Sequence, residues 1–165
     1  MASWCEECGQ THSKTDSECQ FEYEKESEIS DDFKDSLSMV PLVEPIYLHL
    51  CGHTFSLFFI RKHLEQNSDC PLCRTTVPDV QQVLNSPSPA LLRNILGKLS
   101  VTCPFKCGLI CQRMNLASHL QICTNALGSC TNNDNDLICG AVITRADLTH
   151  HLELCDYREI SCPVG

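Results

Sequence analysis

The sequence predicts small α+β modules arranged in tandem, each held by a metal ion, in place of one domain with a continuous core. Its 165 residues include 14 Cys and 7 His, which fall into clusters separated by polar stretches. Units of this size bury too little apolar surface to fold unaided, so they need metal ions or disulfides. Cysteine pairs three positions apart, and histidines followed by a cysteine four positions later, are typical of zinc sites. The predicted cofactor is therefore zinc (Zn2+).

Disulfides are the alternative, because the number of cysteines is even. The N-terminus runs from Met1 straight into Cys5 without the apolar segment of a secretory signal. The longest strongly apolar run, Leu57 to Ile60, is far too short to span a membrane. Disulfides persist mainly in secreted proteins, so we expect zinc sites, a cytoplasmic location and no membrane partner.

The net charge excludes one class of partner. The chain carries 12 Lys and Arg against 21 Asp and Glu, a formal charge of -9. Phosphate backbones are bound by clustered basic side chains, so we expect no nucleic-acid partner. The acid-rich residues 21–34 are predicted to form a solvated linker.

The first module, residues 1–20, is predicted to be a CCHC zinc finger. Its four ligands would be Cys5, Cys8, His12 and Cys19. The turn after Cys8 resembles a zinc knuckle, a module that also binds nucleic acid. Here the basic residues of such knuckles are missing, since Lys14 stands almost alone among acidic neighbours. The prediction for this module is therefore structural zinc binding.

The second module, residues 35–78, carries the set Cys51, His53, Cys70 and Cys73. The sequences from Cys51 to Phe55 and from Cys70 to Arg74 resemble a RING finger, which implies a RING-like ββα unit. A RING interleaves two zinc sites, and the resemblance assigns these four residues to the second. The positions of the first site fall on Asp35, Ser38, Ser56 and Phe59.

The first RING site is thus empty of thiolates and imidazoles, and two interpretations of it are open. Asp35, Ser38 and Ser56 can form hydrogen bonds in place of the zinc, with Phe59 filling the vacated volume, as in the U-box domains that RINGs resemble. Alternatively the first loop is loose, because a lost structural zinc removes a folding contribution of about 10 kcal/mol. A helix is expected over 56–66.

Residues 79–100 are predicted to be a linker followed by a helix. The run from Asn85 to Pro89 is a break, and Ala90 to Leu99 reads as a helix capped by Ser88, with Pro89 in its first turn. The apolar side chains Leu91, Leu92, Ile95, Leu96 and Leu99 share one face. We expect that face to pack against neighbouring modules, with a dimer contact as the alternative.

The last part of the chain contains an internal repeat. Cys107, His119, Cys123 and Cys130 recur 32 residues later as Cys139, His151, Cys155 and Cys162. This predicts two modules, 101–128 and 129–160, with residues 161–165 as the start of a truncated third. The third ligand set is Cys103, Cys107, His119 and Cys123, and the fourth is Cys130, Cys139, His151 and Cys155. The phase of the repeat selects His151 over His150 and leaves Cys111 as a small buried hydrophobic residue.

Both modules resemble TRAF-type zinc fingers, in which a two-stranded turn carries the cysteine pair and a helix carries the histidine. The order of the parts resembles RING-type E3 ubiquitin ligases with TRAF-type zinc fingers, and the N-terminal region is similar to the ligand of Numb protein X family. The four predicted sites are closed by protein ligands, so hydrolytic zinc chemistry is not expected.

The resemblance implies a protein that binds a ubiquitin-conjugating enzyme (E2) and orients its thioester, with Leu37, Pro71 and Arg74 as the contact residues. It implies protein substrates or adaptors as further partners, and oligomerisation through a missing C-terminal region. The alternative function is a ligase-inactive adaptor that binds protein partners through its fingers.

Overall fold

The computed structural model describes residues 3–4, 11–12, 20–134 and 137–158. Cys5, Cys8 and Cys19 of the first predicted zinc set lie outside the described residues, and of His12 only the backbone is described. There β1 (Ser3–Trp4) pairs antiparallel with β2 (Thr11–His12). Cys162 and the start of the truncated module also lie outside the described range.

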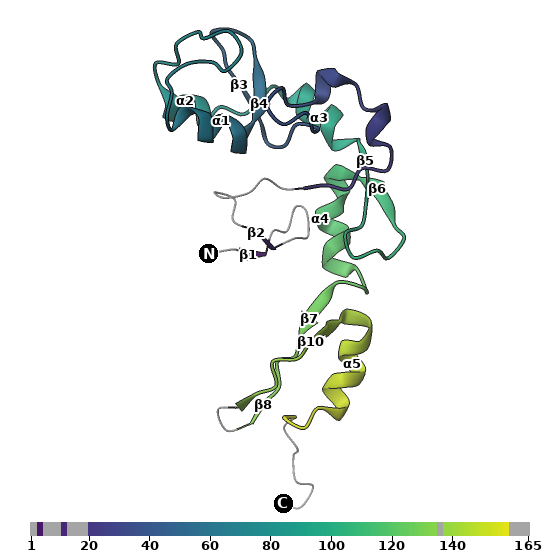
Figure 1. Cartoon of the computed structure of the whole chain (residues 1–165). Helices are drawn as coiled ribbons and strands as arrows, with labels where there is room; N and C mark the ends of the chain where they lie inside the picture. The colour runs from purple at the N-terminus through teal and green to yellow at the C-terminus, as the bar shows by residue number, and fades with distance from the viewer. Residues whose placement is uncertain (1–2, 5–10, 13–19, 135–136, 159–165) are drawn as a thin grey trace, which may run out of the picture.

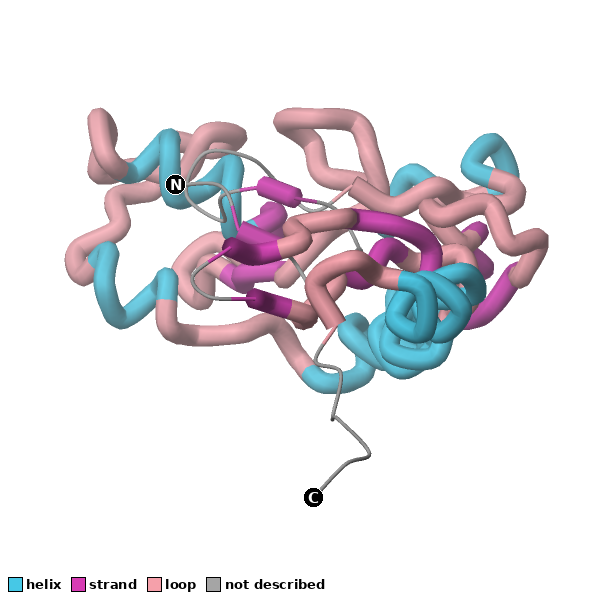
Figure 2. Tube along the Cα trace, turned by 90° about the horizontal axis from the view of Figure 1, so that it is seen from below, coloured by secondary structure: helices cyan, strands magenta, loops and turns pink. Residues whose placement is uncertain are grey.

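The described modules follow one another along an elongated molecule (Figure 1). The RING-like unit with α1 and α2 lies at one end, α3 leads out of it, and the fingers with α4 and α5 continue from there. Every sheet within the described residues is two-stranded and antiparallel. Seen along the long axis, the helices α4 and α5 overlap (Figure 2). The predicted class, small α+β modules in tandem, is confirmed.

The RING-like unit folds around a ββα core. In it β3 (Pro45–Tyr47) pairs with β4 (Thr54–Ser56), and α1 (Leu57–Leu64) begins directly after β4, one residue later than expected. The buried core consists of Ile46, Leu48, Phe55, Ile60, Leu64, Cys70 and Val77. The short helix α2 (Val80–Leu84), in the segment expected to be linker, packs against this core through Val80, Val83 and Leu84.

The helix α3 (Ala90–Gly97) forms where the sequence predicts it, but its start differs. Pro89 occupies the capping position without a side-chain hydrogen bond. Ser88 was expected to cap the helix, and this expectation is wrong, because its backbone N–H donates to the Pro45 carbonyl at 2.8 Å, alongside β3. Its hydroxyl is buried and has no hydrogen-bond partner in the part of the chain that the structure describes.

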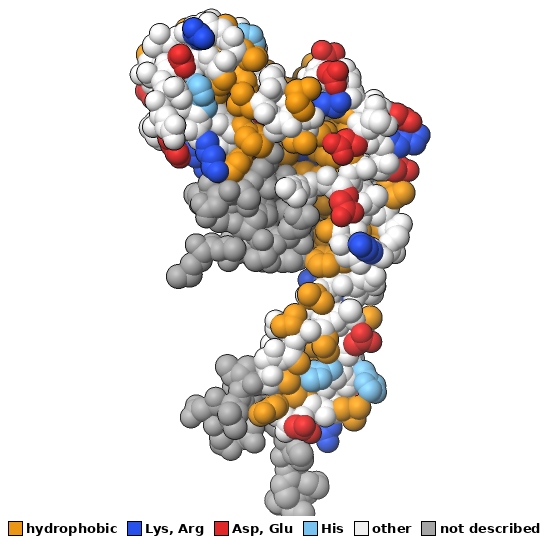
Figure 3. Space-filling view, viewed as in Figure 1, with side chains coloured by type: hydrophobic (Ala, Val, Ile, Leu, Met, Phe, Trp, Pro, Cys, Tyr) orange, Lys and Arg blue, Asp and Glu red, His pale blue; other side chains and the backbone are white. Residues whose placement is uncertain are grey.

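The apolar face of α3 is divided between core and surface. Leu96 is 1 % exposed, whereas Leu91 is 72 % and Ile95 is 36 % exposed. In Figure 3 hydrophobic side chains gather around the joint between the RING-like unit and the first finger. Packing against neighbouring modules therefore uses only part of the face.

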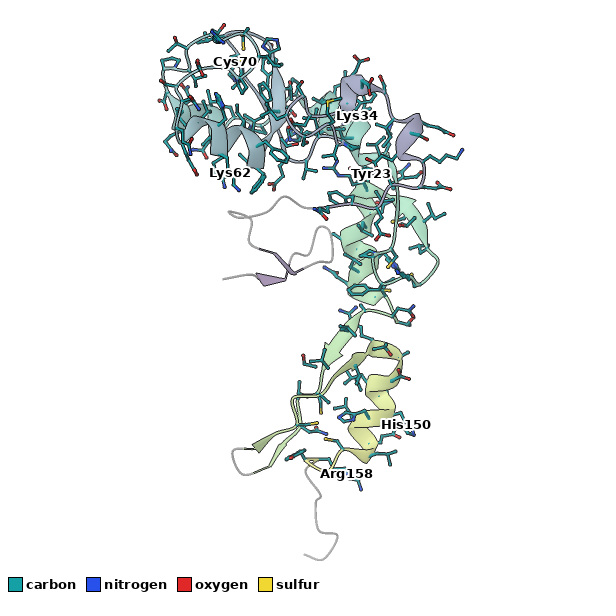
Figure 4. The ribbon with its side chains drawn as sticks, in the orientation of Figure 1. Tyr23, Lys34, Lys62, Cys70, His150 and Arg158 are labelled. Atoms are coloured by element: carbon teal, nitrogen blue, oxygen red, sulfur yellow. The ribbon has the colours of Figure 1, made fainter. Side chains whose placement is uncertain are left out.

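In the first finger β5 (Ser100–Thr102) pairs with β6 (Ile110–Gln112), and α4 (Arg113–Ile122) follows directly. Part of the expected linker joins this finger. Tyr23 forms an antiparallel bridge with Val101, and the N–H of Thr102 donates to the Glu22 carbonyl at 2.8 Å. Tyr23, labelled in Figure 4, packs against the finger's core, as does Phe21. Two 3-10 turns, Glu26–Glu28 and Asp31–Phe33, connect this segment to the RING-like unit.

The second finger repeats this plan with an added hairpin. Its strands β7 (Leu127–Ser129) and β10 (Val142–Thr144) pair, and between them β8 (Asn133–Asp134) pairs with β9 (Leu137–Ile138). The helix α5 (Arg145–Leu154) closes the module, and Thr144 caps it by accepting from the N–H of Asp147 at 3.3 Å. Within the described residues no helix combines the length and apolar character that crossing a membrane requires.

Candidate zinc sites and the rebuilt RING site

Three of the four predicted ligand sets come together in the structure. They are Cys51, His53, Cys70 and Cys73; Cys103, Cys107, His119 and Cys123; and Cys130, Cys139, His151 and Cys155. Within each set the ligand atoms all lie within 4.8 Å of one another. Three thiols and one imidazole at this spacing fit a closed tetrahedral zinc site.

The RING-like site is built by two tight turns. The first brings Cys51 and His53 forward, since the Leu48 carbonyl accepts from the N–H groups of Cys51 and Gly52 at 3.2 and 2.8 Å. In the second turn the N–H of Cys70 donates to the Thr75 carbonyl at 2.8 Å. Cys70 Sγ then lies 3.4 Å from His53 Nδ1. Short-range hydrogen bonds thus aim all four ligands at one point.

The metal-free thiols of this site differ in acidity. Burial raises the pKa of Cys51 to about 11, with hydrogen bonding to neighbouring thiols adding to the effect. Hydrogen bonds from Thr75 lower the pKa of Cys73 to about 6, and its Sγ lies 3.1 Å from Thr75 Oγ1. Because zinc binds thiolates, metal binding at neutral pH must displace the proton of Cys51.

The two finger sites are copies of each other. Cys103 and Cys123 lie 3.8 Å apart at Sγ, as do Cys130 and Cys155 in the second finger. Cys107 Sγ is 3.4 Å from His119 Nε2, and Cys139 Sγ is 3.5 Å from His151 Nε2. After the second cysteine of each pair, Gly108 and Gly140 have φ values of 84° and 62°, which side chains disfavour.

His150 and Cys111 lie outside the ligand sets. His150 is exposed and points away from α5 toward solvent (Figure 4), whereas His151 joins the metal group. Cys111 lies on β6 opposite Val101, is half-buried and packs against the finger's core. Burial raises the pKa of its thiol, as for a small hydrophobic residue.

The first RING position is closed by hydrogen bonds centred on Asp35. This carboxylate is fully buried; Oδ1 accepts from the N–H of Leu37 at 2.6 Å, and Oδ2 from the N–H of Ser56 at 2.5 Å. Ser56 Oγ in turn accepts from the N–H of Val43 at 3.1 Å. This geometry favours the first of the two interpretations, a loop held without zinc.

The other two positions of the lost site contribute differently. The hydroxyl of Ser38 is buried without a hydrogen-bond partner among the described residues. Phe59 is half-buried and packs edge-on against Phe58, with ring centroids 5.1 Å apart. The expected polar network therefore consists of Asp35 and Ser56, and Phe59 supplies packing.

The loop that carries Leu37 is folded back on itself. The N–H of Asp35 donates to the Val40 carbonyl at 2.8 Å, and the N–H of Met39 donates to the Asp35 carbonyl at 2.7 Å. Leu37 itself is 41 % exposed. The loop thus presents an apolar side chain to solvent from an anchored backbone.

Pro71 and Arg74 lie in the turn between Cys70 and Thr75. Pro71 is half-buried, and the side chain of Arg74 is exposed. The N–H of Arg74 donates to the Cys70 carbonyl at 2.9 Å, and its φ is 60°. The same turn that aims the zinc ligands therefore also positions these two residues.

Fold and sites together define a tandem of zinc-finger modules, one RING-like and two of the strand-turn-helix type. No protein-family model matches the chain. Its sequence is similar to the E3 ubiquitin-protein ligase LNX of Mus musculus, 32% identical over 119 residues, which are 71% of this chain and 15% of that protein. It is also similar to the E3 ubiquitin-protein ligase NRDP1 of Xenopus laevis, 35% identical over 85 residues, and of Homo sapiens, 33% identical over 85 residues.

These relatives confirm the resemblance to E3 ubiquitin ligases that the sequence predicts. The NRDP1 alignments cover 50% of this chain and 26% of those proteins. The chain therefore spans between about a seventh and a quarter of the length of the relatives it matches.

Proposed function

We propose that this chain belongs to the ubiquitin system and promotes transfer of ubiquitin from a bound E2 to a protein substrate. The single observation that carries the proposal is the closed first RING position, where Asp35 holds the backbone of Leu37 and Ser56 without a metal. An E2-contact loop must keep its shape to orient a thioester, because this kind of catalysis is positioning.

The likeness to E3 ubiquitin-protein ligases supports the same function. Leu37 is exposed on the anchored loop, and Arg74 is exposed on the turn of the second zinc site. In RING-type ligases, which these motifs resemble, the equivalent basic residue contacts both the E2 and ubiquitin. Arginine suits this role because its planar fork reaches two acceptors at once.

The test is discharge of ubiquitin from a panel of charged E2 enzymes, comparing the native chain with Arg74→Ala. We expect the native chain to accelerate discharge and the variant to lose about tenfold or more in rate, with E2 binding changed less, since the arginine acts mainly in the transition state. The control is Arg158→Ala, which removes an exposed arginine from the end of the second finger (Figure 4).

A ligase-inactive adaptor is the second candidate function. It is favoured by the absence of thiol or imidazole ligands at Asp35, Ser38, Ser56 and Phe59. No acceleration with any E2, by a folded chain whose zinc content is intact, would support the adaptor and contradict the ligase. Binding of an E2 without acceleration would show that the loop docks the enzyme but does not hold the reactive geometry.

We propose further that the four ligand sets hold four zinc ions with a structural role. The module boundaries would be those predicted from the sequence, except that Phe21 and Tyr23 join the first finger and α2 joins the RING-like unit. The chemistry of the three assembled donor sets supports the first point. Protein substrates or adaptors would then bind the fingers, and a cytoplasmic location would suit free thiols that zinc protects.

A further inference from the structure

Two arginines occupy equivalent places in the repeat, although neither belongs to a zinc site. Arg113 and Arg145 are 32 residues apart, the same offset as the zinc ligands. Each is the first residue of its finger's helix, α4 or α5. In each arginine, both the backbone N–H and the guanidinium donate hydrogen bonds to residues that come before its finger's second strand.

Arg145 ties the second finger to the end of the first. Its guanidinium Nη1 donates to the carbonyls of Leu120 and Gln121 at 2.7 and 2.5 Å. These carbonyls belong to the last turn of α4, where they lack partners within the helix and carry partial negative charge. A cation from the following module therefore caps the preceding helix.

The backbone at the same place forms part of this joint. The N–H of Arg145 donates to the Ala126 carbonyl at 2.9 Å, and the N–H of Ala146 donates to the Thr124 carbonyl at 3.0 Å. Only a short connection, from Cys123 to Ala126, separates α4 from β7. In Figure 1 the second finger extends away from α4 beyond this joint. Among the described residues, α4 makes few other contacts with the strands and helix of the second finger.

Arg113 makes the corresponding joint to the RING-like unit. Its Nη1 donates to the Leu42 carbonyl at 2.7 Å and to the Tyr23 hydroxyl at 3.2 Å. The guanidinium also lies over the Phe21 ring, 4.5 Å from the centroid. Leu42 follows the zinc-free loop, and its own N–H donates to the Phe33 carbonyl at 2.8 Å. One side chain thus joins the first finger, the N-terminal segment and the RING-like unit.

We propose that Arg113 and Arg145 are coupling residues that lock successive modules together, so that the RING-like unit and both fingers move as one body. Hydrogen bonds from a charged donor are stronger than those between neutral groups. At the joint to the RING-like unit they add to the packing of Phe21 and Tyr23 against the first finger, and at the joint to the second finger they span a connection of only four residues. The coupling would fix the distance between any group held by the RING-like unit and any partner held by the fingers. It does not depend on the ubiquitin-transfer proposal.

The test is 15N relaxation of the zinc-loaded full chain, which reports the rotational correlation time of each module. We expect the described modules of the native chain to share one correlation time. Arg145→Met keeps the aliphatic length and removes the donors, so residues 127–155 should tumble faster than residues 100–123, which stay coupled to the RING-like unit. Arg113→Met should instead separate the RING-like unit from the finger pair.

Three comparisons keep the test decisive. Arg145→Lys, which retains a cationic donor, should restore much of the common tumbling, and Arg158→Ala in the same finger should leave it unchanged. Zinc content and amide dispersion establish that each variant is folded; if Arg145→Met loses zinc, Arg145→Leu, which also lacks a donor, takes its place. A common correlation time in folded Arg145→Met or Arg145→Leu would overturn the proposal, as would separate tumbling in the native chain.

Discussion

The RING-like unit and the second finger are both built around a Cys3His set, yet they depend on it to different degrees. The RING-like unit buries Phe55 and Ile60 completely, and its cluster also includes Ile46, Leu48, Leu64 and Val77. Among the side chains that the structure describes between residues 127 and 158, only those of the ligands Cys130 and Cys155 are buried. In the second finger, therefore, the metal site itself takes the place of a core.

The difference explains how one module can lose a zinc ion and stay closed. In the RING-like unit a hydrophobic cluster lies beside β4, and the buried carboxylate of Asp35 needs only to bind two backbone N–H groups. In the second finger the helix α5 buries no side chain, so no comparable hydrophobic cluster supports its fold. Metal ligands can be replaced by hydrogen bonds only where packing already holds the chain.

Removal of zinc should have the largest effect, and it tests whether the second finger depends on its metal more than the RING-like unit does. We expect a chelator to unfold the second finger first, since structural zinc contributes about 10 kcal/mol or more to such small units. Amide hydrogen exchange at increasing chelator concentration should show loss of protection in α5 before α1. Reductant alone should change nothing, because these cysteines are free thiols in the structure. Protected amides of α5 in strong chelator would contradict the expectation.

Removal of a single ligand should act on one module only. We expect four zinc ions per native chain, the fourth on the N-terminal set outside the described residues. His151→Ala should lower the count by one and unfold the second finger, because a three-ligand site holds zinc weakly. His150→Ala is the matched control and should leave the count unchanged, since His150 is exposed. Metal analysis of both variants checks this, and zinc loss in His150→Ala would reverse the assignment.

Asp35→Ala tests whether hydrogen bonds have replaced zinc in the first RING position. The substitution leaves the N–H groups of Leu37 and Ser56 without their acceptor, which we expect to cost about 2–5 kcal/mol of unfolding free energy. Zinc content should stay the same, because Asp35 belongs to none of the three ligand sets that the described residues form. Chemical denaturation measures the change.

Asp31→Ala serves as the control for Asp35. Asp31 forms an ion pair with Lys34 at 2.7 Å, but its side chain is 83% exposed, so its removal should change stability by less than about 1 kcal/mol. A small effect of Asp35→Ala, similar to that of Asp31→Ala, would mean that packing alone closes the loop.

The smallest expected effect concerns the exposed side of α3. Leu91→Ala should change stability by less than about 0.5 kcal/mol, because surface substitutions outside packed regions are nearly neutral. Leu96→Ala on the same helix should cost about 2–5 kcal/mol, since Leu96 is fully packed. Thermal unfolding of the pair distinguishes them. A large effect of Leu91→Ala that depends on protein concentration would instead indicate the dimer contact considered from the sequence.

The sequence by itself determined the three metal groups and the repeat. Cys70 and Cys73, or His119 and Cys123, are brought together by a single turn, so their spacing already encodes the geometry. The helices α1 and α3 were likewise predictable to within a few residues, because the arrangement of apolar residues along a helix is a local signal. For α4 and α5, the resemblance to TRAF-type fingers implied a helix that carries the histidine ligand. Arg113 and Arg145 are also separated by the 32 residues of the repeat, but the repeat does not indicate which groups they bind.

Tertiary structure alone decided the contacts between distant residues. Asp35 meets the backbone of Ser56, Tyr23 pairs with Val101, and Arg113 reaches Leu42. Ser88 likewise faces inward because its backbone pairs with β3. Such contacts depend on how modules pack, and a hydrogen bond to a backbone carbonyl leaves no mark on the partner's residue type. For this reason the ligand spacing predicted the metal sites. The hydrogen bonds that close the first RING position and those that join the modules could be seen only in the fold.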